Sequence, residues 1–182
     1  MIKFLVFIVV SIGIILFSRR SLRDNKTHGF YRFFAFEFIL ILILMNINSW
    51  FRNPFGFIHI ISWILLFASI FPAAYGFYLL RMIGKPQGIV ESSSNLGFEN
   101  TTKLVTVGVY KYIRHPLYSS LLLLAWGIYL KKPSVVSTLL ILLTTLFLSA
   151  TAKVEETENI RMFGDAYIEY IRKTKKFIPY LL

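Results

Sequence analysis

Five apolar stretches bounded by basic residues constrain this chain more than any other feature of its sequence. They cover residues 4–18, 33–51, 53–80, 116–130 and 133–152. A helix needs roughly 20 apolar residues to cross the ~30 Å hydrocarbon core of a bilayer. The second, third and fifth stretches are long enough, and basic residues at the ends of a shorter one can reach the interfaces. The pattern predicts an all-α, polytopic membrane helical bundle with about five transmembrane segments.

The composition indicates which environment surrounds these helices. Hydrophobic residues make up 56% of the chain and charged residues 16%, whereas ~25% charged residues is usual for a soluble domain. The net charge of +11 would suit nucleic acid, but nucleic acid would not account for the Phe and Ile runs. We therefore expect the lipid bilayer, and not nucleic acid, as the partner. The absence of Cys removes thiolate metal sites, and no metal site is expected.

The distribution of basic residues predicts an orientation. All but four of the 20 Lys and Arg residues fall on one side of the five-segment arrangement; the exceptions are Lys3, Arg52, Lys131 and Lys132. The positive-inside rule then places the N-terminus outside and the C-terminus in the cytosol. We expect a multi-pass protein of the cytoplasmic membrane, with residues 81–115 and 153–182 facing the cytosol.

We expect a single domain over residues 1–182, with three membrane helices in residues 1–80. Residues 81–182 would follow as a long polar loop, a helical hairpin and a polar tail. The tail pattern predicts two short helices, the first ending at Gly164 and the second capped by Asp165.

The densest group of functional side chains lies over residues 110–118, just before the fourth apolar stretch. Pro116 suits the first turn of a helix, so Arg114 and His115 would lie at the membrane surface beside a helix N-terminus. The free N–H groups of such a terminus favour a carboxylate or phosphate. An interfacial belt of aromatic and basic residues is the alternative interpretation.

Glu155 and Glu156 form a second group, at the inner end of the fifth stretch. Two adjacent carboxylates suit a cationic ligand, although a solvated helical turn is the alternative. The helical hairpin of residues 116–152 would bring both groups to the same cytosolic face. Together they fit a zwitterion with an extra positive charge, and S-adenosylmethionine is such a molecule.

The C-terminal half also carries a sequence motif in a fixed order. Its parts are Leu104-Val105-Thr106-Val107-Gly108-Val109-Tyr110, Arg114-His115-Pro116-Leu117-Tyr118, Glu155-Glu156 and Phe163-Gly164-Asp165-Ala166-Tyr167. In order and spacing it resembles the isoprenylcysteine carboxyl methyltransferase and phospholipid methyltransferase superfamily, over residues 102–179. The resemblance implies an integral membrane methyltransferase that uses S-adenosylmethionine without a Rossmann domain.

The resemblance also implies a cofactor-binding set of residues. By position these are Thr102, Lys103, Leu104, Val105, Gly108, Tyr110, Arg114, His115, Pro116, Leu117, Tyr118, Glu155 and Glu156. Gly108 would allow close approach of the backbone, and Arg114 would hold the cofactor carboxylate or a loop carbonyl. Glu155 would close the pocket, whereas Glu156 would serve the pocket or stay solvated. The catalytic base stays unassigned, with His115 the nearest candidate by titration range.

The expected acceptor is a lipophilic small molecule, such as an isoprenylcysteine-type carboxylate. The sequence departs from the family pattern at Ser120, where Gly is frequent. It departs again at Thr151, where carboxyl-methylating members place an Arg. N-methylation of a phospholipid amine and S-methylation of a thiol therefore remain open.

Glu37 is an acidic residue inside the second apolar stretch, near its cytosolic edge. An ionisable group at such a position suggests a function because its burial is costly. Glu37 would contribute to substrate binding at the membrane mouth or pair with Arg32 or Arg81. A different class of function, a non-catalytic small membrane carrier, would use Glu37 and His59 and would not need Glu155.

Overall fold

The computed structural model describes residues 1–84 and 101–179, which form six α-helices. These are α1 (Ile2–Ser18), α2 (His28–Asn46), α3 (Phe57–Met82), α4 (Pro116–Tyr129), α5 (Val135–Phe163) and α6 (Asp165–Lys173). Short 3-10 turns lie at Ser21–Arg23, Ile47–Ser49 and Gly108–Lys111. The described residues contain no β-strand, only an isolated bridge between Ile113 and Lys175. The all-α prediction is confirmed for this part of the chain, whereas residues 85–100 of the predicted cofactor-binding loop lie outside it.

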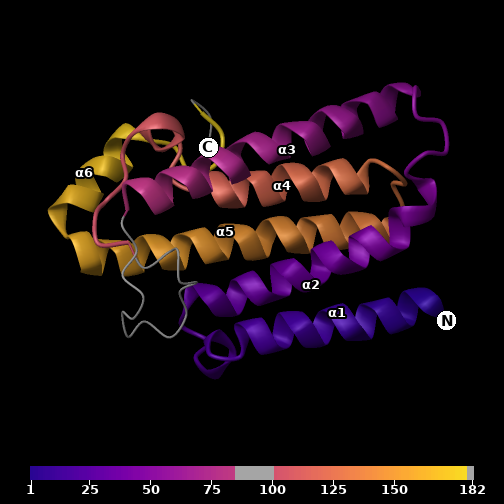
Figure 1. Ribbon diagram of the computed structural model, residues 1–182, viewed down its shortest axis with the longest axis horizontal. Coiled ribbons are helices and arrows are strands. Elements are labelled where there is room, and N and C mark those ends of the chain that lie inside the picture. Colours follow the sequence, from indigo (N-terminus) through magenta and orange to yellow (C-terminus); the bar gives the residue numbers. More distant parts are fainter. Residues whose placement is uncertain (85–100, 180–182) are drawn as a thin grey trace.

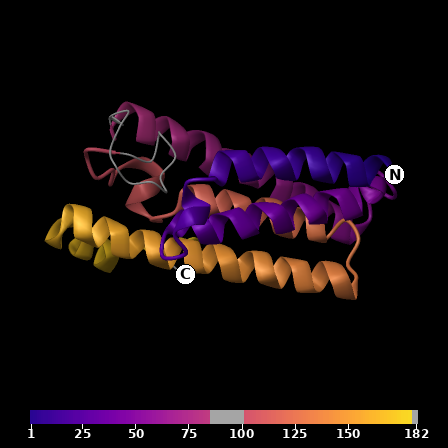
Figure 2. The same cartoon turned by 90° about the horizontal axis from the view of Figure 1, so that it is seen from below.

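Helices α1 to α5 run side by side, and α6 lies across one end (Figure 1). Helix α2 packs most extensively on α5, and α3 on α4. The N-terminus, the α2–α3 connection and the α4–α5 turn share one end of the bundle (Figures 1 and 2). The α1–α2 connection, residues 101–115 and α6 share the opposite end. Residues 101–115 and α6 therefore meet at one end, as the predicted helical hairpin requires.

Within residues 1–84 and 101–179, three helices are long and apolar enough to cross a bilayer: α2 with its following turn, α3 and α5. Helices α1 and α4 are apolar but shorter. Large apolar side chains face outward along the bundle, for example Phe4 on α1, Phe67 on α3 and Leu139 on α5. A water-exposed surface of this kind is costly, so these faces suit contact with lipid. That α1 and α4 also cross the bilayer stays a prediction.

Two helix boundaries differ from the sequence prediction because a charged residue does not end a helix. Helix α2 begins at His28 instead of residue 33, and Arg32 is buried inside it. Helix α5 continues past residue 152 to Phe163, so the first predicted tail helix is the end of α5.

Gly164 ends α5, as predicted, with φ of 59°. Asp165 is the first residue of α6, and Gly164 takes the N-cap position that was predicted for Asp165. The carboxylate of Asp165 still lies in the first turn, where it complements the helix dipole.

Helix α4 is short and lies against three neighbours through close backbone contacts. A side chain at Gly76 of α3 would place its Cβ 3.1 Å from Pro116 Cγ, so any larger residue would require Pro116 to shift by a few tenths of an ångström. On the other side, the buried Asn46 of α2 donates from Nδ2 to the Ile128 carbonyl at 3.0 Å. Small residues and interhelical hydrogen bonds of this kind hold helices together where water is absent. The Gly76 approach lies at the N-terminus of α4, on which the site is built, and the Asn46 hydrogen bond lies near its other end.

Candidate functional site

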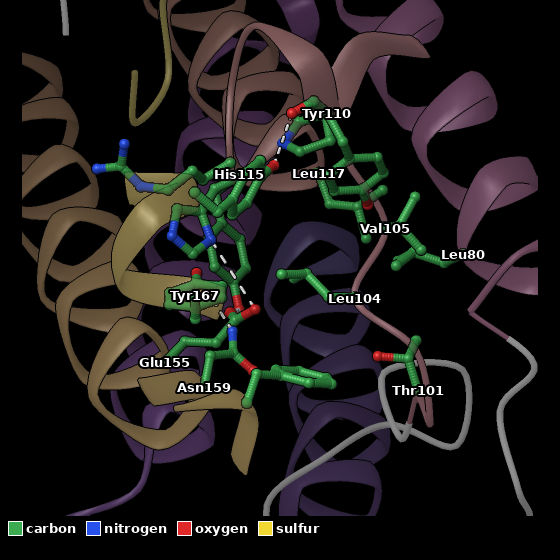
Figure 3. A pocket seen from close by; sticks show the side chains of 15 residues that line it. Leu80, Thr101, Leu104, Val105, Tyr110, His115, Leu117, Glu155, Asn159 and Tyr167 are labelled. Carbon is green, nitrogen blue, oxygen red and sulfur yellow. Dashed lines mark hydrogen bonds and ion pairs between the residues drawn. The ribbon is translucent and has the colours of Figure 1, made fainter. Parts of the chain in front are cut away.

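A hollow opens at the end of the bundle between α4, α5, α6 and residues 101–110. It encloses about 610 Å³ of empty space, open solvent at its mouth included. Its lining residues come from five parts of the chain: Leu80, Thr101, Leu104, Val105, Tyr110, Arg114, His115, Pro116, Leu117, Tyr118, Glu155, Asn159, Phe163, Tyr167 and Tyr170. Figure 3 shows His115, Glu155, Asn159 and Tyr167 on one side of the hollow and Leu80, Thr101 and Val105 on the other. The hollow thus has a polar wall and an apolar wall.

His115 is the N-cap residue of α4, directly before Pro116, and its side chain is 2% exposed. Its Nδ1 lies 3.8 Å from Glu155 Oε1, and its Nε2 lies 3.3 Å from Glu156 Oε1. The ring also stacks on Tyr118, with 5.5 Å between the centroids. Each ring nitrogen therefore has a carboxylate beside it.

Glu155 projects into the hollow from α5, with its side chain 24% exposed. Tyr118 Oη donates a hydrogen bond to Glu155 Oε2 at 2.5 Å. Asn159 follows one turn later on the same helix and therefore shares its face; its Nδ2 donates to Tyr167 Oη at 3.4 Å. The unbroken helix α5 thus carries a carboxylate and an amide into the hollow.

Four aromatic side chains, Tyr110, Phe163, Tyr167 and Tyr170, add a ring-lined region to the hollow. Tyr170 Oη donates to the Tyr110 carbonyl at 2.7 Å, which ties α6 to the turn before α4. Burial raises the pKa of the Tyr167 and Tyr170 phenols, so both stay neutral at physiological pH. Neutral aromatic faces attract cations, and a desolvated cation gains most from them.

Arg114 and Glu156 form an ion pair behind His115. Arg114 Nε donates to Glu156 Oε1 at 2.7 Å, and Nη1 donates to the carbonyls of Thr174 and Ile171 at 2.5 and 3.3 Å. Carbonyl partners of this kind were one of the two predicted roles of Arg114, and the other, a contact with the cofactor carboxylate, stays a prediction. Glu156 is 14% exposed and also lies 3.4 Å from Lys176 Nζ. It is paired with protein side chains, so the prediction of a solvated carboxylate is wrong.

The structure brings most of the predicted cofactor residues together. Those that line the hollow are Leu104, Val105, Tyr110, Arg114, His115, Pro116, Leu117, Tyr118 and Glu155. Those outside its lining, among the described residues, are Thr102, Lys103, Gly108 and Glu156. Gly108 has φ of 60°, and a Cβ there would lie 2.7 Å from Leu79 Cδ1, so its close approach is to α3. A ligand role stays a prediction for all of these residues, inside and outside the lining.

Sequence reasoning assigned no role to six lining residues: Leu80, Thr101, Asn159, Phe163, Tyr167 and Tyr170. Asn159 and Phe163 follow Glu155 at helical spacing on the helix predicted to end at Gly164, and this signal could have found them. Phe163 and Tyr167 also lie inside the quoted motif. Nothing in the sequence pattern marks Leu80 or Tyr170.

Two polar residues of the apolar segments lie apart from this site. Ser11 of α1 donates from Oγ to the Glu37 carboxylate at 2.9 Å, and Glu37 does not line the hollow. A role of Glu37 in substrate binding stays a prediction. His59 lies at the opposite end of the bundle, where its ring nitrogens contact the carbonyls of Asn53 and Lys131 at 2.6 and 3.0 Å.

Comparisons with known proteins agree with the motif. Over 121 residues the chain is 31% identical to the protein-S-isoprenylcysteine O-methyltransferase of Schizosaccharomyces pombe, a match that covers 63% of this chain and 51% of that protein. Probable protein-S-isoprenylcysteine O-methyltransferases of Oryza sativa, subspecies indica and japonica, are 34% identical over 85 residues. Those matches cover 46% of this chain and 44% of each rice protein. The chain spans about half the length of the curated relatives it matches.

No solved structure matches the chain in the corresponding comparison. A sequence profile described as phospholipid methyltransferase matches residues 57–166, which is more than half of the chain. This match covers α3, α4 and α5, and it includes both His115 and Glu155. The family predicted from the motif is thereby confirmed: the chain belongs to the phospholipid methyltransferase family.

Proposed function

We propose that the chain is a membrane methyltransferase that transfers a methyl group from S-adenosylmethionine to a carboxylate on a lipid-like acceptor. One observation carries this proposal: His115 and Glu155, which belong to the two arms of the α4–α5 hairpin, line one hollow at one end of an apolar bundle. Both belong to the segment that matches the methyltransferase family.

The chemistry of the hollow fits S-adenosylmethionine. The cofactor carries a carboxylate, an amine and a sulfonium. The N-terminus of α4, where His115 is the N-cap residue, suits the carboxylate, and the Glu155 carboxylate offers negative charge to a cation. The rings of Tyr167 and Tyr170 suit a desolvated cation. When bound, the cofactor supplies a methyl carbon that its positive sulfur already activates, so the chain mainly has to bind and align the reactants.

The surroundings of His115 favour an acceptor that needs no base. An amine must lose a proton before it attacks, and a general base would be required. Both ring nitrogens of His115 face carboxylates, and Glu155 already accepts a hydrogen bond from Tyr118. A carboxylate acceptor is nucleophilic as it stands. The named relatives are O-methyltransferases, which agrees with this choice.

Thr151 is a reason not to assign this chain the same acceptor as those relatives. Its side chain is buried, and its hydroxyl donates to the Phe147 carbonyl in the same helix at 2.7 Å. It therefore offers no charge to an acceptor carboxylate at the position where an Arg was expected from the resemblance. We accordingly propose the acceptor as a class, a carboxylate on an apolar chain.

Incubation of the purified full chain with methyl-labelled S-adenosylmethionine tests this function. The acceptors compared are a farnesylcysteine carboxylate, phosphatidylethanolamine, a long-chain thiol and a total membrane lipid extract. We expect label in a product of the carboxylate acceptor, released by mild base because a methyl ester hydrolyses. Base-stable label on the amine or the thiol would make that compound the acceptor class in place of the carboxylate. The absence of label from every acceptor would overturn the proposal.

The topology is part of the proposal: five crossings, the N-terminus outside and the hollow in the cytosol. The structure supports it because the basic α1–α2 connection and α6 lie at the same end of the bundle as the hollow (Figure 1). The chain has no Cys, so single-Cys variants report one position each. An impermeant maleimide added to intact cells should label Lys132→Cys, in the α4–α5 turn, and not Asn25→Cys, in the α1–α2 turn. The reverse labelling would contradict the orientation.

A further inference from the structure

We propose that Glu156 is a positioning residue: it holds the His115 ring in the hollow and joins that ring to the C-terminal segment, without binding the cofactor. Consecutive residues of a helix point about 100° apart, so two adjacent carboxylates cannot share one face. Glu155 lines the hollow, whereas Glu156 lies behind His115 and outside the lining. The inference rests on the proposed function only for its expected effect on S-adenosylmethionine binding.

The charges around Glu156 support this separation of roles. Arg114 Nε lies 2.7 Å from Glu156 Oε1, and Lys176 Nζ lies 3.4 Å from Oε2. Each carboxylate oxygen thus already has a cationic partner from the chain itself. The cofactor's positive groups would have to displace those partners. Glu155 has no Lys or Arg partner among the described ion pairs and remains the more available carboxylate.

The C-terminal segment, residues 174–177, is bound to the same place. The His115 backbone N–H donates to the Lys176 carbonyl at 3.2 Å. Ser119 Oγ donates to the Phe177 carbonyl at 2.7 Å. The buried Phe177 ring packs on the His115 ring, with 6.2 Å between the centroids. The segment therefore supports the imidazole from behind, and Glu156 connects the segment to that ring.

Loss of the Glu156 charge should accordingly leave the His115 ring less firmly held in its position. The Nε2 atom lies 3.3 Å from Glu156 Oε1, and this contact fixes the ring plane that presents Nδ1 to Glu155. With a neutral amide in its place, the ring loses its strongest partner on that side. The cofactor site would then be less well ordered, although every residue that lines it is still present.

Nitrogen NMR of the cofactor-free full chain tests this directly. The chain has three His residues, so few ring signals have to be told apart. The variant is Glu156→Gln, and His115→Gln assigns the signals. We expect the ring ¹⁵N signals of His115 to shift, while those of His28 and His59 stay in place. Glu169→Gln is the matched control, since Glu169 is an exposed carboxylate paired with Lys173 on α6. This control should leave the ring ¹⁵N signals of all three His residues unchanged.

Calorimetry separates positioning from direct binding. Glu156→Gln should weaken S-adenosylmethionine binding by about threefold to tenfold, which is less than the loss expected for Glu155→Ala. Lys176→Gln, a milder variant if Glu156→Gln does not fold, should shift the His115 signals in the same direction by a smaller amount. Unshifted His115 signals in both variants would overturn the inference. So would an affinity loss equal to that of Glu155→Ala. Because the NMR experiment needs no methyl transfer, its result stands even if no acceptor is methylated.

Discussion

Replacement of Glu155 by Ala should weaken the binding of S-adenosylmethionine by about tenfold to a hundredfold, because a hydrogen bond to a charged group is worth about 1.5–3 kcal/mol. Glu155 is the carboxylate that projects into the hollow, and it is the partner of the Tyr118 hydroxyl. Its removal takes away the negative charge that would attract the cofactor's cationic groups. It also leaves the Tyr118 hydroxyl without this acceptor. Isothermal titration calorimetry on the purified full chain measures the change.

Glu169→Ala is the control for this substitution. Glu169 is exposed and pairs only with Lys173 among the described ion pairs, so its removal should leave cofactor affinity unchanged. Equal affinities of wild type and Glu155→Ala would contradict the assignment of the hollow as the cofactor site. The same variant separates the enzyme from a membrane carrier. A carrier that works through Glu37 and His59 would tolerate Glu155→Ala and would fail with Glu37→Gln.

The helices of the bundle could be predicted from hydropathy because the apolar stretches are long and the breaks between them are charged. The same rule misplaced the boundaries of α2 and α5. A charged residue ends an apolar stretch but not a helix, since Arg32 and Lys153 both continue the helical hydrogen bonding. Gly164 was predicted correctly, because its positive φ ends a helix for a local reason.

The centre of the site could also be predicted, because it depends on a helix N-terminus and a hairpin. Pro116 marks the start of α4, and the hairpin returns Glu155 to the same end. The aromatic part could not be predicted in full. Tyr170 reaches the hollow only because α6 folds back after Gly164 and bonds the Tyr110 carbonyl. That direction depends on tertiary packing, for which the local sequence carries no signal.

Sequence reasoning treated Glu155 and Glu156 as a pair that faces a cation. In the structure one carboxylate faces the hollow, and the other faces two basic residues of the chain. The sequence contains the basic residues concerned, Arg114 and Lys176, but neither lies near Glu156 along the chain. Only the return of the C-terminal segment alongside α4 brings Lys176 to this carboxylate. A ligand in the hollow therefore meets less negative charge than the number of neighbouring acidic residues suggests.

Arg114→Ala should be the most destabilising substitution at this end of the bundle. The Arg114 side chain is 8% exposed, and one guanidinium donates to the Glu156 carboxylate and to the carbonyls of Ile171 and Thr174. Removal of one partner from a buried ion pair costs about 3–5 kcal/mol when the remaining charge is left uncompensated. Lys176 stays beside Glu156, so we expect a loss at or below the lower end of that range, to which the two unpaired carbonyls add. We expect a clearly lowered midpoint of thermal unfolding for the cofactor-free chain in detergent.

Arg114→Lys shows whether the charge or the planar fork of donors matters. An ammonium keeps the positive charge, but it cannot span a carboxylate and two carbonyls as the guanidinium does. The midpoint of Arg114→Lys should therefore fall between those of Arg114→Ala and wild type. Arg172→Ala removes an exposed Arg of α6 and should leave the midpoint unchanged. If Arg114→Ala unfolded at the wild-type temperature, the guanidinium would not be the connection between α4, α5 and the C-terminal segment. If Arg114→Lys matched wild type, charge alone would account for that connection.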